Sequence, residues 1–385
     1  MQKKLIAVMV AGALAAPLAN ADSANVSISG WFSAGVEQYK VSQGSAATAV
    51  AGGYHTETRV SDEGSRFILS GTEDLGGGLK AWFNMESRFA TDTGTAPTNV
   101  GLAAGNTGVG LQGGFGKLTI GRWDLHYNEF GVIEGYRANS NQDNLTAGPM
   151  SQMTTTASGT APRNIARATR TDNLIMWDSP NWAGVTARAA YSQNPSGGEG
   201  SGRGADGSKD GAYNLVVRWA QGPVAVGASY WNWKAEGTTA INDEKSLRAW
   251  AGFTFPFGLK IGVGYDNSQQ RVATETADFT KRNAWLVPVS YSFGNEAIYA
   301  TYAKIAKLSG PNGGSTVDDT GAKAYVFGWD HAMSKRTTVG AYYSVVDNDA
   351  NAHYAPFNLT LGVTMPVPSN GEKTSQIYVG MKHIF

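Results

Sequence analysis

The chain has 385 residues and a formal net charge of +0, with 31 basic and 31 acidic side chains and no Cys. The balanced charge gives no reason to expect a nucleic-acid partner, and the lack of Cys excludes a disulfide scaffold and any Cys metal site. Glycine supplies 49 residues, about twice its ordinary share. Trp (11), Tyr (16) and Phe (14) are also numerous. A membrane-spanning β-barrel places such aromatic residues in belts at the two membrane surfaces, so the composition favours that class over a soluble β protein.

Residues 1–21 have the pattern of a secretory signal peptide. Two lysines precede an apolar run from Leu5 to Ala16, and a small-x-small cleavage sequence ends at Ala21. The run is too short to cross a bilayer as a helix, and no later segment reaches the roughly 18 apolar residues that a membrane helix requires. We therefore expect residues 1–21 to be removed on export and residues 22–385 to form one transmembrane domain.

The mature sequence repeats one pattern, with apolar residues at alternate positions until a cluster of Gly, Asn, Asp or Ser. In 79–89, Phe83 and Met85 lie on one face, while Trp82 and Glu86 lie on the other. Similar alternation occurs in 185–191, 213–219, 247–255 and 259–266. The polar face would meet solvent in a soluble sandwich, but in a lipid-embedded barrel it must line a water-filled lumen.

The connections between these segments fall into two classes. Short turns include 74–78, 112–116, 182–184, 221–223, 257–258 and 333–336, and long connections include 41–63, 91–106, 123–170, 194–211, 235–245, 268–282 and 309–323. Outer-membrane barrels have short periplasmic turns and long extracellular loops. Sixteen strands would use about 23 residues per strand and connection, and eighteen would use about 20. We predict an all-β, antiparallel up-and-down barrel, with sixteen strands preferred.

The last segment supports the same class. Ile377, Val379, Met381 and His383 alternate along one face, and the sequence stops on the aromatic Phe385. The last strand of an outer-membrane barrel has this pattern, although the final strand of a soluble sandwich would also alternate. Together with the export signal, the ending favours the barrel. Phe385 is predicted to be part of the assembly signal that the barrel-insertion machinery reads.

Several stretches carry a family resemblance. Residues 59–80 read RVSDEGSRFILSGTEDLGGGLK, and they are followed in order by GFGKLTIGR (114–122), DSPNWAG (178–184), SKRT (334–337) with VDN (346–348), and YVGMKHIF (378–385). Together these stretches, which span the mature chain, resemble the general diffusion porins of Gram-negative bacteria, of the β-proteobacterial and neisserial type. Two departures are visible. Leu69 and Ser70 stand where that family has a Gly-x-Lys pattern, and the segment after Arg122 is unusually long.

The resemblance implies a sixteen-stranded barrel in the outer membrane, assembled as a homotrimer in contact with lipid and lipopolysaccharide. Its water-filled channel would pass ions and small hydrophilic solutes by passive diffusion. The third long loop, from Trp123 to about Arg170, would fold into the lumen and form a constriction. Glu129 and Glu134, early in this loop, are the better constriction candidates, and Asp143 is a further acidic one.

Alternation places basic residues on the water-facing wall. The candidates are Arg66, Lys80, Arg88, Lys117, Arg188 and Arg218, with Arg248 and Lys260 on the same face. Arg122 joins them through the resemblance, because Gly121 makes the alternation ambiguous at that point. Only Glu86 and Asp266 are assigned as acids to the same face. Basic walls attract anions, while the acids of the loop oppose them, so we expect a weak anion preference.

Two other functions remain open. A substrate-specific channel for sugars or anions is one, and Tyr230, Trp231 and Trp233 would suit a sugar path, although a place in the membrane-surface belt is the more ordinary role for them. An outer-membrane barrel enzyme is the other. Of the five His, His126 alone lies near candidate acids, and no hydrolase, zinc-protease or phosphate-loop pattern occurs. We expect no catalytic residue, cofactor or metal.

Overall fold

The computed structural model describes residues 25–44, 55–95, 101–133, 152–153, 163–164, 170–193, 195, 210–235, 241–273, 279–310, 318–356 and 368–385. The expected signal peptide (residues 1–21) and the candidates Glu134 and Asp143 lie outside the described residues. Helical structure within these ranges is limited to two 3-10 segments, η1 (Gly101–Ala103) and η2 (His126–Val132). No helix there is both long and apolar enough to cross a membrane.

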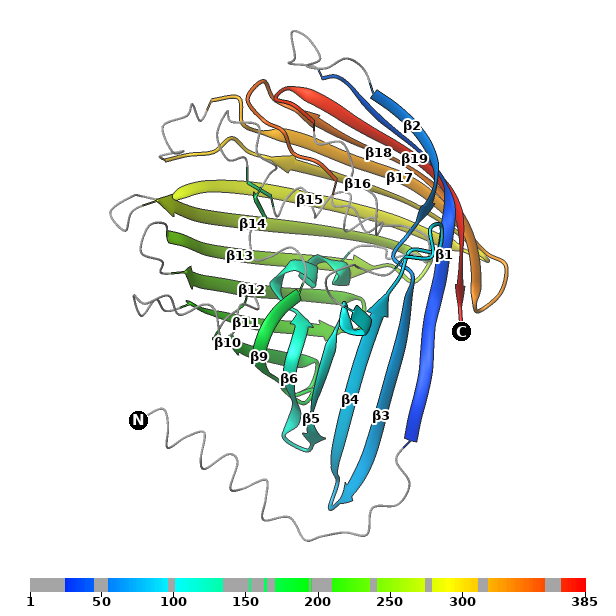
Figure 1. The fold of residues 1–385 in the computed structure, drawn as a ribbon, viewed down its shortest axis with the longest axis vertical. Helices are drawn as coiled ribbons and strands as arrows, with labels where there is room; N and C mark the ends of the chain where they lie inside the picture. The colour runs from blue at the N-terminus through cyan, green and yellow to red at the C-terminus, as the bar shows by residue number, and fades with distance from the viewer. Residues whose placement is uncertain are drawn as a thin grey trace.

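The described chain is otherwise an antiparallel meander in which most strands pair with the next one along the chain, while β2 and β3 both pair with β1, and β6 pairs with β9 (Figure 1). The strands are β1 (Asn25–Gln43), β2 (His55–Asp62), β3 (Arg66–Gly76), β4 (Leu79–Arg88), β5 (Thr107–Gly113), β6 (Gly116–Asp124), β7 (Gln152–Met153), β8 (Arg163–Asn164), β9 (Arg170–Asp178), β10 (Val185–Ser192), β11 (Asp210–Gln221), β12 (Val224–Ala235), β13 (Ile241–Thr254), β14 (Leu259–Ala273), β15 (Thr280–Phe293), β16 (Glu296–Ile305), β17 (Ala322–Ala332), β18 (Thr337–Asn348) and β19 (Glu372–Ile384). Strands β7 and β8, which follow β6 and precede β9 in the sequence, form a separate two-stranded sheet.

The main sheet closes on itself. Strand β1 pairs with β19 from Trp31 opposite Ile384 to Gln43 opposite Glu372. On its other edge β1 pairs with β2 in its second half and with β3 in its first half. Because β2 and β3 occupy one position, the 17 segments of this sheet make a closed barrel of sixteen strands. The prediction of sixteen strands is therefore confirmed.

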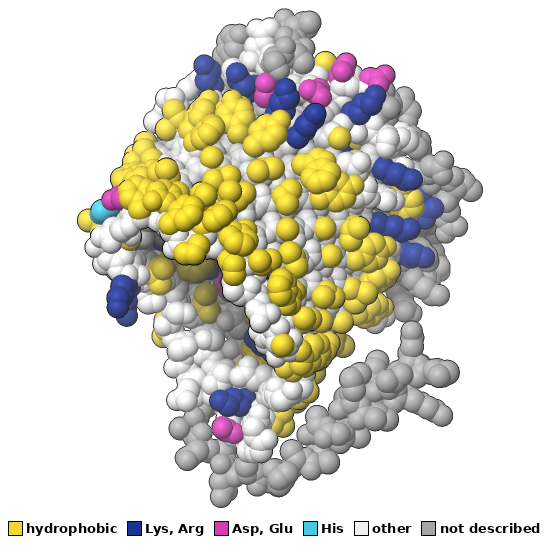
Figure 2. Space-filling model, turned by 180° about the vertical axis from the view of Figure 1, so that it is seen from behind, with side chains coloured by type: hydrophobic (Ala, Val, Ile, Leu, Met, Phe, Trp, Pro, Cys, Tyr) yellow, Lys and Arg dark blue, Asp and Glu magenta, His cyan; other side chains and the backbone are white. Residues whose placement is uncertain are grey.

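The outer face of the barrel is apolar, as the alternation predicted. In β19, the outward Ile377 and Val379 are 49% and 58% exposed, whereas Tyr378 between them is 0% exposed. Figure 2 shows hydrophobic side chains spread over a broad area of the outer face, with many Lys, Arg, Asp and Glu gathered near its edges. Soluble monomers rarely expose apolar patches larger than a few hundred Å². The surface therefore fits contact with lipid.

The connections alternate between short and long, as predicted, but several bounds differ: β13 already begins at Ile241, and β14 extends to Ala273. The first long connection ends earlier than position 63, because β2 resumes at His55. A long connection between Asn348 and Glu372, which sequence analysis did not identify, joins β18 to β19. The short turn at 76–78 shows why the turns are rich in glycine, since Gly76, Gly77 and Gly78 all have positive φ (84°, 60° and 80°).

Candidate functional site

The third long loop enters the barrel directly after β6 and is fixed to the inner wall by η2. His126, at the start of η2, is 0% exposed and lies between two wall hydroxyls. Its Nδ1 is 2.7 Å from Ser229 Oγ on β12, and its Nε2 is 2.8 Å from Ser246 Oγ on β13. Arg248 Nη1 donates to the backbone oxygen of His126 at 3.2 Å. The loop is thus bonded to two adjacent strands at its first turn.

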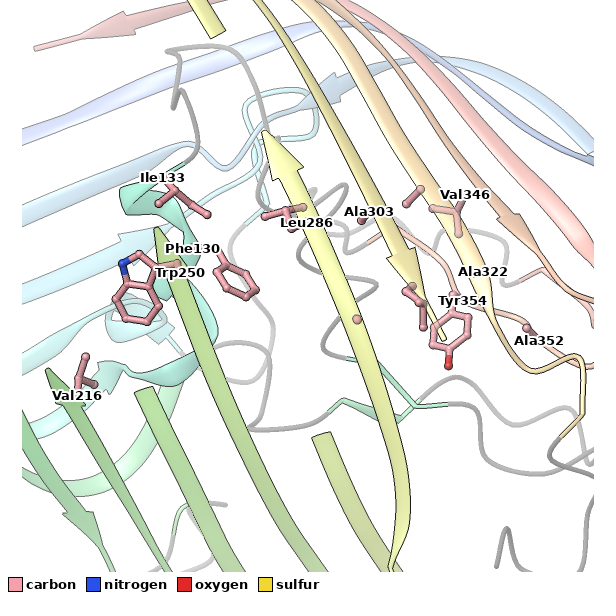
Figure 3. Close-up of a cluster of buried hydrophobic side chains, with 13 residues drawn as sticks. Phe130, Ile133, Val216, Trp250, Leu286, Ala303, Ala322, Val346, Ala352 and Tyr354 are labelled. Atoms are coloured by element: carbon pink, nitrogen blue, oxygen red, sulfur yellow. The ribbon is translucent and has the colours of Figure 1, made fainter. Parts of the chain in front are cut away.

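Apolar contacts extend this attachment across β13 and β14. Phe130 and Ile133 are buried, and they pack against Trp250 and Leu286 in one cluster (Figure 3). A Cβ added to Gly264 would lie 2.8 Å from the Phe130 ring. One added to Gly252 or Gly262 would lie 2.9 or 2.8 Å from Ile133. Glycines on the inner face of the wall therefore make room for η2, so the described first part of the loop lies inside the barrel as predicted.

Glu129, also in η2, binds two arginines of the wall. Arg218 Nε on β11 donates to Glu129 Oε2 at 2.8 Å, and Arg188 Nη1 on β10 lies 3.9 Å from Glu129 Oε1. Arg188 also donates through Nε to Asp178 Oδ1 on β9 at 2.7 Å. The Glu129 side chain is only 3% exposed, while those of Arg218 and Arg188 are 23% and 15% exposed. Two arginines are therefore balanced here by two carboxylates.

A second cluster forms where β3 and β9 begin and β4 ends. Three arginines converge on Glu86 Oε1: Arg66 Nη1 at 3.1 Å, Arg88 Nε at 3.0 Å and Arg170 Nη2 at 3.3 Å. Arg170 Nη2 also lies 3.5 Å from Asp124 Oδ2. Three guanidinium groups thus share two carboxylates. This cluster carries an excess of positive charge beside the point where the third loop leaves the wall.

A third cluster is fully enclosed. Asp266 on β14 accepts from Arg248 Nε at 2.7 Å and from Arg282 Nη2 at 3.3 Å, and all three side chains are 0% exposed. Arg248 and Asp266 had been assigned to the water-facing side, and they do lie on the inner wall. However, η2 and its contacts cover them. Their role is to hold the loop rather than to meet permeating ions.

Three further candidates on the inner wall are Arg122, Lys117 and Lys80. Arg122 forms an ion pair with Asp172 on β9 beside a register shift between Gly121 and Trp123. That shift accounts for the ambiguous alternation at Gly121. Lys117 Nζ lies 3.6 Å from the centre of the Trp82 ring and 5.4 Å from that of Trp123. Lys80, on β4, is exposed.

Two aromatic residues differ from expectation. Trp231 and Trp233 are 0% and 7% exposed and pack with Leu125 of the third loop inside the barrel. They do not belong to an outer aromatic belt, and their burial also removes them as an open sugar path. A further side chain, Tyr354, comes from the long connection after β18 and packs with Ala303, Ala322 and Val346 (Figure 3). A second loop therefore contributes to the interior.

The geometry is unfavourable for catalysis at His126, because that side chain has no solvent exposure and both ring nitrogens are engaged. Burial, followed by the positive charge of Arg248, lowers the pKa of His126 well below its usual value. Within the described ranges, no three His, Asp or Glu side chains gather as a metal-ligand set.

Sequence reasoning missed the acidic partners of the wall arginines. Asp172 and Asp178 lie on β9, and Asp178 stands directly opposite Arg188 in the register of β9 and β10. Asp178 was visible in the motif at 178–184, but its partner depends on how strands are staggered around the barrel, which a single strand does not reveal. Arg170 was assigned to the loop, yet it begins β9 and reaches Glu86, 84 residues earlier.

Comparisons with known proteins agree with this architecture. A family model described as Gram-negative porin matches residues 7–351. An outer membrane porin protein of Bordetella pertussis is 26% identical over 323 residues, covering 74% of this chain and 78% of that protein. The major outer membrane protein P.IB of Neisseria meningitidis serogroup B is 25% identical over 345 residues, covering 88% and 91%.

Solved structures show the same fold. An anion-selective porin from Comamonas acidovorans has a TM-score of 0.70 at 20% identity and covers 94% of this chain and 100% of that one. The trimer form of OmpT, an outer membrane protein of Vibrio cholerae, has a TM-score of 0.63 at 14% identity, with coverage of 94% and 100%. The relatives by sequence are porins, which are channels and not enzymes. The chain belongs to the Gram-negative porin family and forms an outer-membrane channel for diffusion.

Proposed function

We propose that this channel passes ions and small hydrophilic solutes without a dedicated substrate and with a weak preference for anions. The observation that carries the preference is the charge of the inner wall, where three arginines share Glu86 and Asp124. Lys80 and Lys117 add two further positive charges. The proposed lining residues are Arg66, Lys80, Arg88, Lys117, Arg122, Arg188 and Arg218, opposed by Glu129, Glu134 and Asp143.

The preference is expected to be weak because most guanidinium groups already have a carboxylate partner. A paired arginine presents a dipole to a passing ion, and the field of a dipole falls off faster than that of a free charge. Salt screens what remains, with a Debye length of about 10 Å at 0.1 M. The excess positive charge near Glu86, together with Lys80 and Lys117, therefore sets the sign of the ion selectivity, and the pairing of the arginines limits its size.

A reversal potential measured across a planar bilayer in a potassium chloride gradient tests this proposal. A channel with weak anion preference should give a small reversal potential with the same sign as the chloride equilibrium potential. A potential of the opposite sign would contradict the assigned wall. Current that saturates with, or is blocked by, a neutral sugar would instead indicate a substrate-specific channel.

We further propose that the chain works as a homotrimer in contact with outer-membrane lipid and lipopolysaccharide. Residues 1–21 would be removed on export, and the barrel-assembly machinery would insert residues 22–385. No catalytic role is assigned. The trimer form of the OmpT structure is consistent with this assembly. Unheated protein should migrate on a denaturing gel as a species larger than the monomer, and migration at monomer mass without heating would contradict the trimer.

A further inference from the structure

Three neighbouring polar side chains on the inner wall lack the close carboxylate that each wall arginine has. Lys80 on β4, Gln112 on β5 and Lys117 on β6 stand directly opposite one another in the register of these strands. Among the described residues, the side chains of these three form no hydrogen bond and no ion pair, although the Lys117 ammonium group lies 3.6 Å from the centre of the Trp82 ring. By contrast, each wall arginine proposed above has a carboxylate within 4 Å.

The nearest carboxylates on this row are engaged elsewhere. Asp74 is opposite Lys80, but its Oδ1 accepts from the backbone N–H of Gly76 at 2.8 Å. Asp178 is opposite Lys117, but its Oδ1 accepts from Arg188 at 2.7 Å. Each ammonium group therefore keeps N–H donors for solvent or a ligand, although that of Lys117 also lies over the Trp82 ring and is attracted by Asp178 from beyond ion-pair distance. Adjacent strands are about 4.8 Å apart, so the two Cα atoms are separated by about 10 Å with Gln112 between them.

The row borders an open hollow of about 390 Å³, lined by Lys80, Gln112 and Lys117 together with Gly78, Gly113, Gly116 and Ser179. This volume is many times the roughly 30 Å³ of a water molecule, so it accommodates a hydrated ion. The glycines belong to the short turns at 76–78 and 113–116. The hollow therefore lies at the short-turn end of the barrel, which faces the periplasm in outer-membrane barrels.

We propose that Lys80, Gln112 and Lys117 form a binding site for small oxyanions of the phosphate or sulfate class at the periplasmic end of the channel. Two ammonium groups and an amide N–H₂ offer donors to several oxygens of one anion, which suits a tetrahedral oxyanion better than chloride. Trp82, which lies under Lys117 at 3.6 Å, holds that ammonium group over its ring. This inference rests on the proposed anion preference and adds to it a place and a ligand class.

Chloride currents in a planar bilayer test this binding site, with inorganic phosphate at pH 8 added to one side of the membrane at a time. Wild-type channels should lose chloride current in a saturable manner, with phosphate more effective from the short-turn side. Replacing Lys80→Gln and Lys117→Gln together should raise the half-blocking concentration by about tenfold or more, because two charges are lost near the anion. Gln112→Leu should have a smaller effect in the same direction.

The matched control replaces Lys335→Gln and Arg336→Gln, which removes two positive charges from another short turn at the same end of the barrel. That variant should keep the wild-type half-blocking concentration within about twofold, since long-range attraction is screened by salt. Equal loss of block in both double variants would overturn the proposal in favour of a general charge effect. Full block in the Lys80 and Lys117 variant would overturn it as well.

A second experiment tests the site without measuring conduction. Phosphate is added to folded protein in detergent, and its binding is measured from the width of the phosphorus NMR signal. Broadening by the wild-type protein but not by the Lys80 and Lys117 variant would support the site even where no current is recorded. Chloride current without any effect of phosphate on current or signal width would overturn the site and leave the proposed diffusion function intact. Absence of any current would count against the proposed function alone.

Discussion

Glu129 and Arg218 join the third loop to the barrel wall: Arg218 Nε donates to Glu129 Oε2 at 2.8 Å, across 89 residues of sequence. The same carboxylate lies 3.9 Å from Arg188. One acidic side chain thus has two effects, since it holds η2 in place and masks two positive charges. These effects are separable, because the loop is also attached through His126, Phe130 and Ile133.

Glu129→Gln should increase anion preference. The amide keeps the size of the side chain but removes the charge, so Arg188 and Arg218 no longer have a shared counter-ion. At about 4 Å and an effective dielectric of about 20, a unit charge shifts the energy of an ion by about 4 kcal/mol before screening. The reversal potential in a potassium chloride gradient should move toward the chloride equilibrium potential.

Asp318→Asn, which neutralises an exposed carboxylate paired with Lys307, is the control and should leave the reversal potential unchanged. An unchanged reversal potential in Glu129→Gln would show that Glu129, Arg188 and Arg218 do not lie on the path of the ions.

Gly264→Val should lower single-channel conductance. A Cβ at this position would come within 2.8 Å of the Phe130 ring, so η2 must move away from the wall and further into the lumen. A narrower lumen conducts less. Gly114→Ala is the control, because nothing lies within 4 Å of a Cβ added there. Unchanged conductance in a folded Gly264→Val channel would mean that η2 does not bound the narrowest zone.

Acidification should weaken the attachment of the loop through His126. The pKa of this group is lowered by burial and by Arg248, while Asp266 acts in the opposite direction. The folded state therefore keeps His126 neutral, and below a pH of about 6.5 the unfolded chain binds a proton that the folded chain does not. This contribution reduces stability by up to about 1.4 kcal/mol per pH unit as the pH falls from 6.5.

Urea unfolding of wild type and His126→Gln between pH 5 and pH 7.5 measures that contribution. The variant should be less stable at pH 7.5, yet its stability should depend less on pH. His383→Gln, at an exposed position on the outer face, is the matched control and should keep the wild-type slope. A wild-type slope in His126→Gln would show that another group controls the pH dependence.

Alternation explains how much of the structure is readable from the sequence. A period of two decides which face of a strand meets lipid, so the outward row of β19 and the inward Trp82 and Glu86 are predictable. The same reasoning fails in β12, because Tyr230, Trp231 and Trp233 put aromatic residues on both faces. It fails again at Arg122, where the register shift between Gly121 and Trp123 interrupts the period.

Pairing within the lumen is a property of the closed barrel rather than of any strand. Arg88 lies two residues from Glu86 on the same face of β4, whereas Arg66 and Arg170, 20 and 84 residues from Glu86, reach it only through the stagger of β3, β4 and β9. The charges were predictable as a set, whereas the partners were not. The sequence already predicts a weak anion preference because acids of the loop oppose the basic wall, and the pairing of the wall arginines with carboxylates supplies a second reason for it.

Deleting Phe385 should reduce the amount of protein in the outer membrane. Its backbone N–H donates to Gly30 O at 3.1 Å, and its ring lies 5.8 Å from Phe32, so it joins the last strand to the first at the seam where the barrel closes. Loss of these contacts weakens the seam, and the proposed assembly signal is lost with it. Immunoblots of outer-membrane fractions measure the effect, with Phe115→Ala, an exposed aromatic at a short turn, as the control. Phe385→Tyr keeps the ring and the N–H and should restore normal levels. Normal abundance of the deletion variant would show that neither the seam contact nor the terminal aromatic limits assembly.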